Sequence, residues 1–166
     1  HLRQSLADHF REDPHNVNAY VIGQRGSRKV IPWTLATVAG MPLYDFARTT
    51  DREWNDEIRD GIVCDMDEAM HEIVSVKDGL QFSMAVSTVR LIRAILGDER
   101  KVFTVSTVLE KGNGHMEAAV SLPTVISRRG RESAVPLVLT PAEREQFERS
   151  ARSVRETYHS IHNGGE

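Results

Sequence analysis

Residues 19–33 read AYVIGQRGSRKVIPW, and this stretch decides how the rest of the chain is interpreted. An apolar run breaks at Gly23 into a polar segment and resumes at Val30. Two apolar runs separated by a short glycine-containing segment are typical of a β-hairpin. The expected turn carries three cations, which are Arg25, Arg28 and Lys29. The pattern therefore predicts a hairpin with a basic tip, and it raises the question of what that tip binds.

The composition around this hairpin is that of a globular protein. The 166 residues are enough for one domain with a hydrophobic core, and the net charge of -3 gives no general attraction to nucleic acid or to an anionic membrane. No apolar run approaches the roughly 18 residues of a membrane span. Cys64 is the only cysteine, so no internal disulfide can form. We therefore expect a cytoplasmic domain with no nucleic-acid partner and no membrane partner.

Secondary structure on either side of the turn follows from the apolar spacing. Strands are expected at residues 17–22 and 30–38. A helix precedes them and ends near Asp13 and Pro14, because proline bars continuation of a helix. Apolar residues of this helix have helical spacing, but no capping residue precedes Leu2. We therefore expect the chain to begin inside a helix, as a fragment of a longer protein.

Three further helices are predicted. Thr50 and Glu53 form a capping-box pattern, which predicts a long helix that ends at residues 78–79. The next helix contains Phe82 and is closed by Gly97. The start of the last helix is marked by an N-cap, a proline at the first position and a glutamate at the third, which are Thr140, Pro141 and Glu143.

Three β-branched and apolar segments predict strands at residues 102–109, 118–126 and 134–139. Residues 112–114 predict a turn between the first two, and Pro123 predicts that its strand lies at an edge or carries a bulge. The element order favours an α+β domain, in which an antiparallel β-sheet packs with long helices. GxGxxG and GxxxxGK[ST] are both absent, so no known phosphate loop is predicted.

Four segments carry motifs that occur together in one family. Residues 16–43, NVNAYVIGQRGSRKVIPWTLATVAGMPL, are similar to VxAYVIGEHGDSxVPVWSxAxVGGxPL. Residues 72–85, EIVSVKDGLQFSMA, are similar to EIIxxKGxTxxxxA. Residues 102–130 are similar to VLTVSxxLxGxYGxxDVxxGVPxxxxRxG, and residues 139–158 to LTxEExxxFxxSAxxLKE. In this order the motifs resemble those of the L-lactate/malate dehydrogenase family over essentially the whole chain.

The resemblance implies that residues 1–166 form the C-terminal, substrate-binding domain of such an enzyme, without the N-terminal Rossmann half. In the family that half binds NAD. The implied activity of the complete protein is an NAD-dependent oxidoreductase acting on a small 2-hydroxy or 2-oxo acid. The implied partners are its own Rossmann domain and further copies of the same chain in a homo-oligomer.

The catalytic position of the family departs from its pattern here. A histidine in the family's GEHG turn takes up the hydroxyl proton, and Arg25 matches it. A guanidinium stays protonated in proteins and cannot accept that proton. Three interpretations stay open for this turn. It is a solvated basic turn, it binds an anion with Arg25, Arg28 and Lys29, or Arg25 anchors the substrate carboxylate while His1 acts as the base.

Positions that contact substrate in the family depart as well. His1 falls on the first arginine of the family's LDxARxR motif, and imidazole cannot make that residue's two-pronged contact with a carboxylate. His1 is either native or the end of a purification tag. A family threonine near the substrate matches Leu80, which cannot hydrogen-bond, whereas Met84 stands where an apolar residue faces the nicotinamide. These departures favour loss of the standard reaction.

Two weaker sites complete the set. Some bacterial members bind a sugar bisphosphate with an arginine that matches Arg3 and a histidine whose place is taken by Asn18, so a surface arginine is favoured. No metal site is predicted, because His159 and His162 have no accompanying carboxylate or cysteine set. The leading hypothesis is an impaired half of a dehydrogenase. The alternative is a non-catalytic module that binds an anion or assembles with an active subunit.

Overall fold

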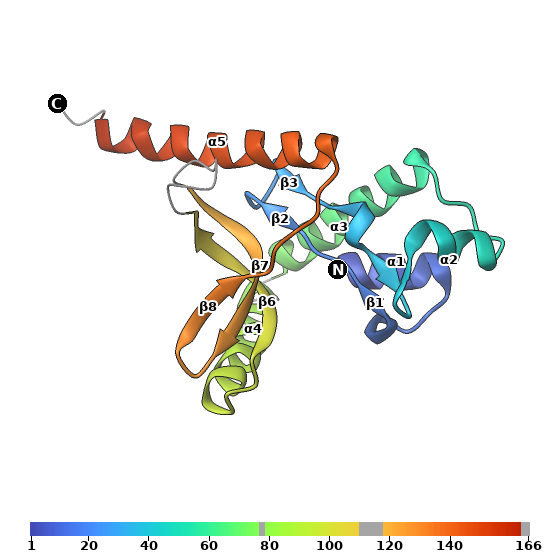
Figure 1. Cartoon of the computed structure of the whole chain (residues 1–166), viewed down its shortest axis with the longest axis horizontal. Helices are drawn as coiled ribbons and strands as arrows, with labels where there is room; N and C mark the ends of the chain where they lie inside the picture. Colours follow the sequence, from blue (N-terminus) through green and yellow to red (C-terminus); the bar gives the residue numbers. More distant parts are fainter. Residues whose placement is uncertain (77–78, 110–117, 164–166) are drawn as a thin grey trace. The chain divides into compact units, whose positions relative to one another are not determined.

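The computed structural model describes residues 1–76, 79–109 and 118–163 (Figure 1). The elements in chain order are α1 (Leu2–Phe10), η1 (Pro14–Asn16), β1 (Val17–Asn18), β2 (Ile22–Gly23), β3 (Lys29–Val30), η2 (Trp33–Leu35), β4 (Thr37–Val38), β5 (Met41–Pro42), α2 (Leu43–Thr49), α3 (Asp56–Ser75), α4 (Gly79–Leu96), β6 (Lys101–Val108), β7 (Ala119–Ser127), β8 (Gly130–Ala134) and α5 (Pro141–Asn163). Both sheets are antiparallel, so the predicted α+β class is confirmed.

The chain divides into two compact units. Unit 1 comprises residues 1–20 and 33–92, and unit 2 comprises residues 21–32 and 93–166. The sheet β1-β4-β5 belongs to unit 1, and the sheet β3-β2-β7-β6, with β8 paired to β7, belongs to unit 2. The hairpin predicted from residues 19–33 therefore lies mainly in unit 2.

The core of unit 1 forms around the buried face of α1. Leu2, Leu6 and Phe10 recur at a spacing of four and are all buried. Phe10 packs edge-on against Phe46 of α2, with ring centroids 5.4 Å apart. Trp54 continues this aromatic cluster and lies 5.7 Å from Phe10. The edge-to-face contact of Phe10 with Phe46 adds to the apolar burial that holds α1 and α2 together.

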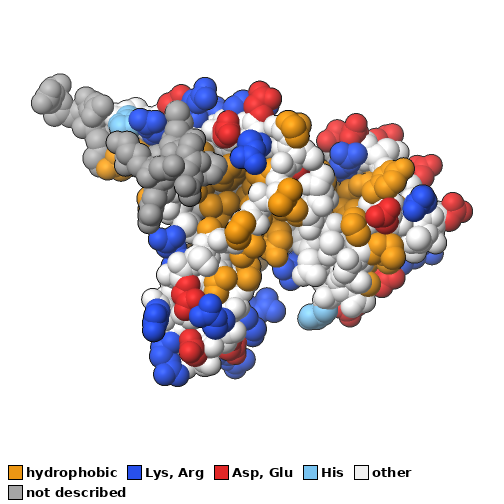
Figure 2. Space-filling model, viewed as in Figure 1, with side chains coloured by type: hydrophobic (Ala, Val, Ile, Leu, Met, Phe, Trp, Pro, Cys, Tyr) orange, Lys and Arg blue, Asp and Glu red, His pale blue; other side chains and the backbone are white. Residues whose placement is uncertain are grey.

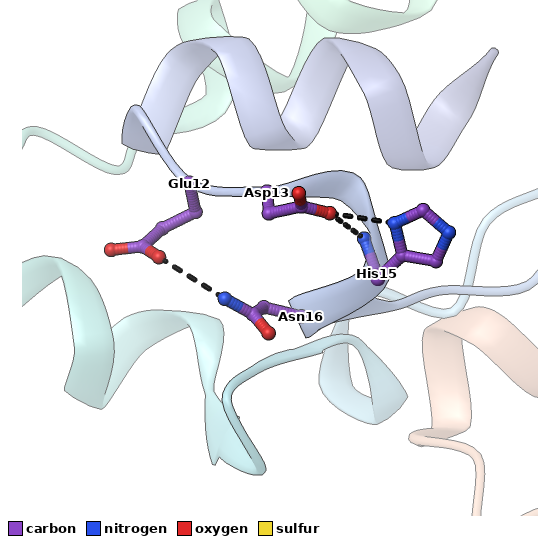
Figure 3. A network of polar contacts seen from close by, with 4 residues as sticks. All are labelled: Glu12, Asp13, His15 and Asn16. Atoms are coloured by element: carbon purple, nitrogen blue, oxygen red, sulfur yellow. Dashed lines mark hydrogen bonds and ion pairs between the residues drawn. The ribbon is translucent and has the colours of Figure 1, made fainter.

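A short acidic turn follows α1 (Figure 3). Asp13 caps η1 by accepting the backbone N–H of His15 at 2.8 Å, and its Oδ1 also lies 2.7 Å from Nδ1 of the same histidine. The backbone hydrogen bond from His15 is the largest cause of a lowered pKa for the Asp13 carboxyl, and the side-chain hydrogen bond adds to it. Asn16 donates to Glu12 at 3.5 Å across the same turn. A carboxylate therefore organises this connection.

Strand β7 is the centre of the unit 2 sheet. It pairs with β6 from Lys101 to Val108, with β2 at Ser121, and with β8 from Thr124 to Ser127. The prediction of an edge strand for Pro123 is therefore wrong, because partners lie on both sides of β7. A register shift between Thr124 and Ile126 on the β8 side supports the bulge alternative.

Helix α5 covers β2, β3 and β7 in unit 2. Its predicted capping box is confirmed, since Glu143 accepts both the backbone N–H and the hydroxyl of Thr140 at 2.9 Å. The Glu143 N–H returns a bond to Thr140 Oγ1 at 3.3 Å. Phe147 and Ala151 lie on the buried face, whereas Tyr158, further along, is 57% exposed. The N-terminal half of α5 is therefore the part that packs against the sheet.

The two strands predicted beside the basic turn are wrong in extent. Residues 17–22 contain β1 and only the first residue of β2, and these strands belong to different sheets. Residues 30–38 are divided between β3 and β4 by the 3-10 turn η2. Pro32 has no N–H to give to a ladder and stands directly before that turn. The hairpin itself is confirmed, because β2 pairs with β3 in register Ile22↔Val30.

Three other boundaries also differ from prediction. Thr50 ends α2, since its hydroxyl donates to the Phe46 carbonyl at 2.7 Å, and Asn55 caps α3 by accepting the Ile58 N–H at 2.9 Å. Strand β8 begins at Gly130 and ends at Ala134, so it is earlier than predicted. Helix α3 ends at Ser75, before the predicted end at residues 78–79. Residue 78 and the predicted turn at residues 112–114 lie outside the described residues.

Among the described helices, none by itself has the length and apolarity to cross a membrane. Only α3 and α4 taken together, as a strongly bent pair, reach the required length and composition.

Candidate functional site

The basic turn between β2 and β3 has a backbone that depends on glycine. Gly23 has φ +82° and Gly26 has φ +100°, a region that residues with a side chain rarely adopt. The N–H of Lys29 donates to the Gly26 carbonyl at 3.2 Å and closes the turn. Arg25 therefore lies at the tip, between the two glycines.

Ser150 of α5 anchors this turn from beneath. Its Oγ accepts the backbone N–H of Gln24 at 2.7 Å and donates to the carbonyl of Arg28 at 2.7 Å. The serine is 2% exposed, so both bonds are shielded from water. A Cβ at Gly23 would lie only 2.5 Å from this hydroxyl. One buried side chain therefore holds the backbone on both sides of the tip, at Gln24 and at Arg28.

The cations on the turn differ in their surroundings. Arg25 and Arg28 are exposed, and within the described residues neither guanidinium makes a hydrogen bond or an ion pair. Lys29 is half-buried and has a partner. Beside them, Oε1 of Gln24 is buried and has no hydrogen-bond partner in the described part of the chain. The turn thus offers exposed positive charge next to one unsatisfied amide group.

The remaining predicted site residues belong to unit 1. His1 precedes α1 without capping it, and both His1 and Arg3 are exposed. On α4, Leu80 is half-buried and Met84 is 57% exposed. Within unit 2 the structure therefore brings together Arg25, Arg28 and Lys29, while the other four residues are carried by two helices of unit 1.

Sequence reasoning missed Ser150 and the Gln24 amide. A signal for the serine was present, because Ser150 stands between Phe147 and Ala151 on the apolar face of α5. A polar residue on a buried face needs a hydrogen-bond partner. The Gln24 amide gave no such signal, since its burial depends on packing around the turn.

In the described ranges, no group of three or more His, Cys, Asp and Glu side chains is placed to hold a metal ion. His159 instead accepts a hydrogen bond from Nε of Arg155 at 3.2 Å along α5.

Comparison with known families assigns the fold. Residues 1–163 match the lactate/malate dehydrogenase, alpha/beta C-terminal domain family. The chain belongs to this family. The L-lactate dehydrogenase of Kosmotoga olearia is 32% identical over 96% of the chain and 50% of its own length. That of Clostridium botulinum is 26% identical over 94% of the chain and 49% of its own length. The chain therefore spans about half the length of the curated relatives it matches.

Solved structures agree with this assignment. The lactate dehydrogenase of Cryptosporidium parvum, in a complex with lactic acid and β-nicotinamide adenine dinucleotide, aligns with a TM-score of 0.83 at 28% identity. The alignment covers 98% of this chain and 51% of that enzyme. The malate dehydrogenase of the same organism aligns with the same TM-score at 24% identity, which shows a shared fold. The resemblance inferred from the four sequence motifs is thus confirmed.

Proposed function

We propose that this chain is the substrate-binding half of a lactate/malate-dehydrogenase-like oxidoreductase whose standard reaction is impaired at Arg25. The complete protein would use NAD, bound mainly by a Rossmann half that these residues do not include. Its substrate would be a small 2-hydroxy or 2-oxo acid. Support comes from the family membership and from a relative that holds lactic acid and the nicotinamide cofactor.

One observation carries the proposal. The turn that matches the family's catalytic GEHG segment keeps an ordered hairpin, held by Ser150, and presents Arg25 at its exposed tip. A general acid/base must be within hydrogen-bond reach of the proton that it moves, and it must change protonation state near neutral pH. Arg25 is placed on the turn where the family keeps its proton carrier, but a guanidinium stays protonated and cannot take up a proton.

Arginine at this position has chemistry of its own. A guanidinium binds a carboxylate with two parallel N–H···O bonds, which a histidine cannot do. Arg25 and Arg28 are exposed on one turn, so a carboxylate or a phosphate is the ligand class that fits them. The turn would therefore hold an anionic group without moving its proton.

The residues present fit only a part of the cofactor. Met84 offers an exposed thioether on α4, which suits packing against a flat ring. GxGxxG is absent from the sequence, so the chain lacks the loop with which dinucleotide-binding folds hold the pyrophosphate. NAD, when bound, would supply the acceptor for hydride. The contribution of this chain would be to bind and orient the acid.

NADH-dependent reduction of pyruvate and of oxaloacetate by the intact protein tests this function. General acid/base catalysis contributes roughly 10²- to 10⁴-fold, so we expect turnover lower than that of ordinary lactate dehydrogenases by at least about 100-fold. Arg25→His should raise kcat about tenfold or more, because it restores a proton carrier on an intact turn. Arg28→His is the matched control and should give no gain. Turnover at ordinary rates by the unaltered protein would overturn the proposal.

A second candidate is a non-catalytic module that assembles with an active subunit. It is favoured by α4, on which several large apolar side chains are 47–74% exposed, namely Phe82, Met84, Val86, Val89, Ile92 and Leu96. An apolar surface of this kind marks an interaction site. Co-purification of a catalytically active dehydrogenase subunit with the tagged chain would support this candidate. The first candidate, an impaired dehydrogenase, would be supported if the intact protein formed a homo-oligomer in the cytoplasm and became active after Arg25→His.

A further inference from the structure

A second basic feature of unit 2 lies away from the turn at Arg25. A cavity of about 730 Å³ opens where β7 turns into β8, and Figure 2 shows Lys and Arg side chains, with a few acidic ones, gathered toward this end. Its lining residues are Asp98, Arg100, Ser127, Arg128, Arg129, Arg131 and Glu132. Four arginines against two carboxylates leave a net charge of +2 (four minus two). The volume is within the range of small-molecule sites, roughly 300–1,000 Å³.

The backbone of this turn is fixed by local bonds. Arg128 and Arg129 form the two-residue connection between Ser127 and Gly130, which pair across the hairpin, and Gly130 has φ +82°. Oγ of Ser127, which is 1% exposed, accepts the N–H of Arg129 at 3.1 Å. Oδ1 of Asp98 accepts the N–H of Arg128 at 2.9 Å. Both arginines are therefore presented from an ordered backbone.

The two carboxylates of the cavity already have partners. Asp98 receives the Arg128 N–H, and Glu132 pairs with Arg100 at 2.7 Å. The guanidinium groups of Arg128 and Arg129 are exposed and form no hydrogen bond or ion pair within the described residues. Two permanent cations thus remain available at the mouth of the cavity.

This cavity is separate from the proposed substrate turn. Strand β7 meets β2 at Ser121, where its partner is Gly23, and reaches the cavity six positions later at Ser127. Six residues of extended strand span about 20 Å. A ligand as small as a hydroxy acid could not contact both places.

We propose that the cavity is a binding site for a small phosphorylated ligand. The arginine fork matches the oxygens of a phosphate group in two parallel hydrogen bonds. Adjacent guanidinium groups on one turn suit a ligand with two phosphate groups, because each cation can face one of them. The volume leaves room for the organic part of such a ligand beside its phosphates. This proposal does not rest on the reaction proposed for Arg25.

Titration of the chain with inorganic pyrophosphate, followed by calorimetry and by the backbone amide signals of Arg128 and Arg129, tests the site. We expect saturable binding with shifts of these two signals. Arg128→Ala/Arg129→Ala should weaken the binding by roughly tenfold or more, since charge-assisted hydrogen bonds are lost. Arg144→Ala/Arg152→Ala removes the same charge from the exposed side of α5 and is the matched control, with binding and shifts at residues 128–129 unchanged.

Three results would overturn the proposal. One is the absence of saturable binding by the unaltered chain at millimolar pyrophosphate. Another is equal affinity in the Arg128→Ala/Arg129→Ala variant, with circular dichroism showing that the variant is folded. The third is equal binding of citrate, which would point to any polyanion in place of a phosphate ligand. Arg128→Lys/Arg129→Lys keeps the charge and the fold, and retention of only part of the affinity would support recognition by the guanidinium fork.

Discussion

Unit 2 carries two basic turns that are built in different ways. A glycine with positive φ stands at each turn, since Gly23 ends β2 and Gly130 begins β8. In both turns a serine hydroxyl holds the backbone and two arginines are exposed. The turn at Arg25 is anchored by Ser150, a residue 126 positions away from Gln24. The turn at Arg128 is anchored by its neighbour Ser127 and by Asp98. The first turn therefore depends on the docking of α5, while the second depends mainly on its own hairpin.

The largest difference in stability between the two turns is expected when Gly23 or Gly130 is replaced by alanine. Gly23→Ala should lower the free energy of unfolding by about 3 kcal/mol, because the new Cβ would combine positive-φ strain with a 2.5 Å approach to Ser150 Oγ. Gly130→Ala has the same φ of +82° and nothing within 4 Å of its Cβ. We expect it to cost about 1 kcal/mol from strain alone.

Urea unfolding followed by circular dichroism measures both losses. Gly26→Ala is a further control within the first turn, because its φ is +100° and its Cβ would also meet open space. It should resemble Gly130→Ala. Equal losses at Gly23 and Gly130 would contradict the view that contact with α5 distinguishes the two turns.

Local signals predicted the start of α5 and the β2–β3 hairpin. The capping box of Thr140 and Glu143 needs only four consecutive residues, so it can be read before any tertiary contact is known. The box predicted from Thr50 was wrong for a local reason as well. Thr50 bonds back to Phe46 and ends α2, and Asn55 supplies the cap of α3. Where two capping signals stand close together, the sequence alone does not choose between them.

The serine anchors give the second prediction. Ser150→Ala should lower the free energy of unfolding by about 2 kcal/mol, because it removes two shielded hydrogen bonds at once. Ser127→Ala removes the bond from the Arg129 N–H and should cost about 1 kcal/mol. Hydrogen exchange gives a local measurement, since the backbone N–H of Gln24 should exchange faster in Ser150→Ala and not in Ser127→Ala.

Ser160→Ala is the control for loss of a serine from α5, because that hydroxyl only bonds to a carbonyl one turn earlier. Its unfolding free energy should be within about 0.5 kcal/mol of the parent value. If Ser127→Ala proved as costly as Ser150→Ala, the distinction between a distant and a local anchor would fail.

Asp98 provides a smaller test of the second turn. Asp98→Ala should cost about 1 kcal/mol, since it loses the bond to the Arg128 N–H and places alanine at a φ of +50°. Asp98→Asn keeps an acceptor oxygen and a residue type that tolerates this φ, so its cost should be close to zero. Thermal unfolding of the two variants side by side checks the pair. A larger loss for asparagine than for alanine would exclude this account.

The candidate site was only partly predictable. The position of Arg25 followed from motif spacing, because a hairpin with flanking glycines keeps its tip whatever residue occupies it. The role of Ser150 did not, because it requires the register of α5 over a turn far away in sequence. The cavity at Arg128 was missed for the same reason, since Asp98 and Arg100 reach it from a segment about 30 residues earlier.

The turn at Asp13 extends the comparison to an anchor that titrates. Ser150 and Ser127 hold their turns with hydroxyls, which keep their state across the pH range, whereas Asp13 holds η1 with a carboxylate. The pKa of that carboxyl is lowered, first by the backbone N–H of His15 and then by its side chain. A pKa lowered by folding means stability that is present above the unfolded pKa and is lost as pH falls through the folded one.

Acid titration followed by NMR of the Asp13 carboxyl should therefore show a midpoint below the usual aspartate range. His15→Ala should leave most of this lowering in place, because the backbone N–H that causes the largest part remains. Asp13→Asn should remove the pH dependence of the turn while keeping an acceptor for the same N–H. A return of the midpoint to the usual aspartate range in His15→Ala would show that the imidazole, and not the backbone, holds the carboxylate ionised. In that case this turn would be anchored by a side-chain pair, unlike either basic turn of unit 2.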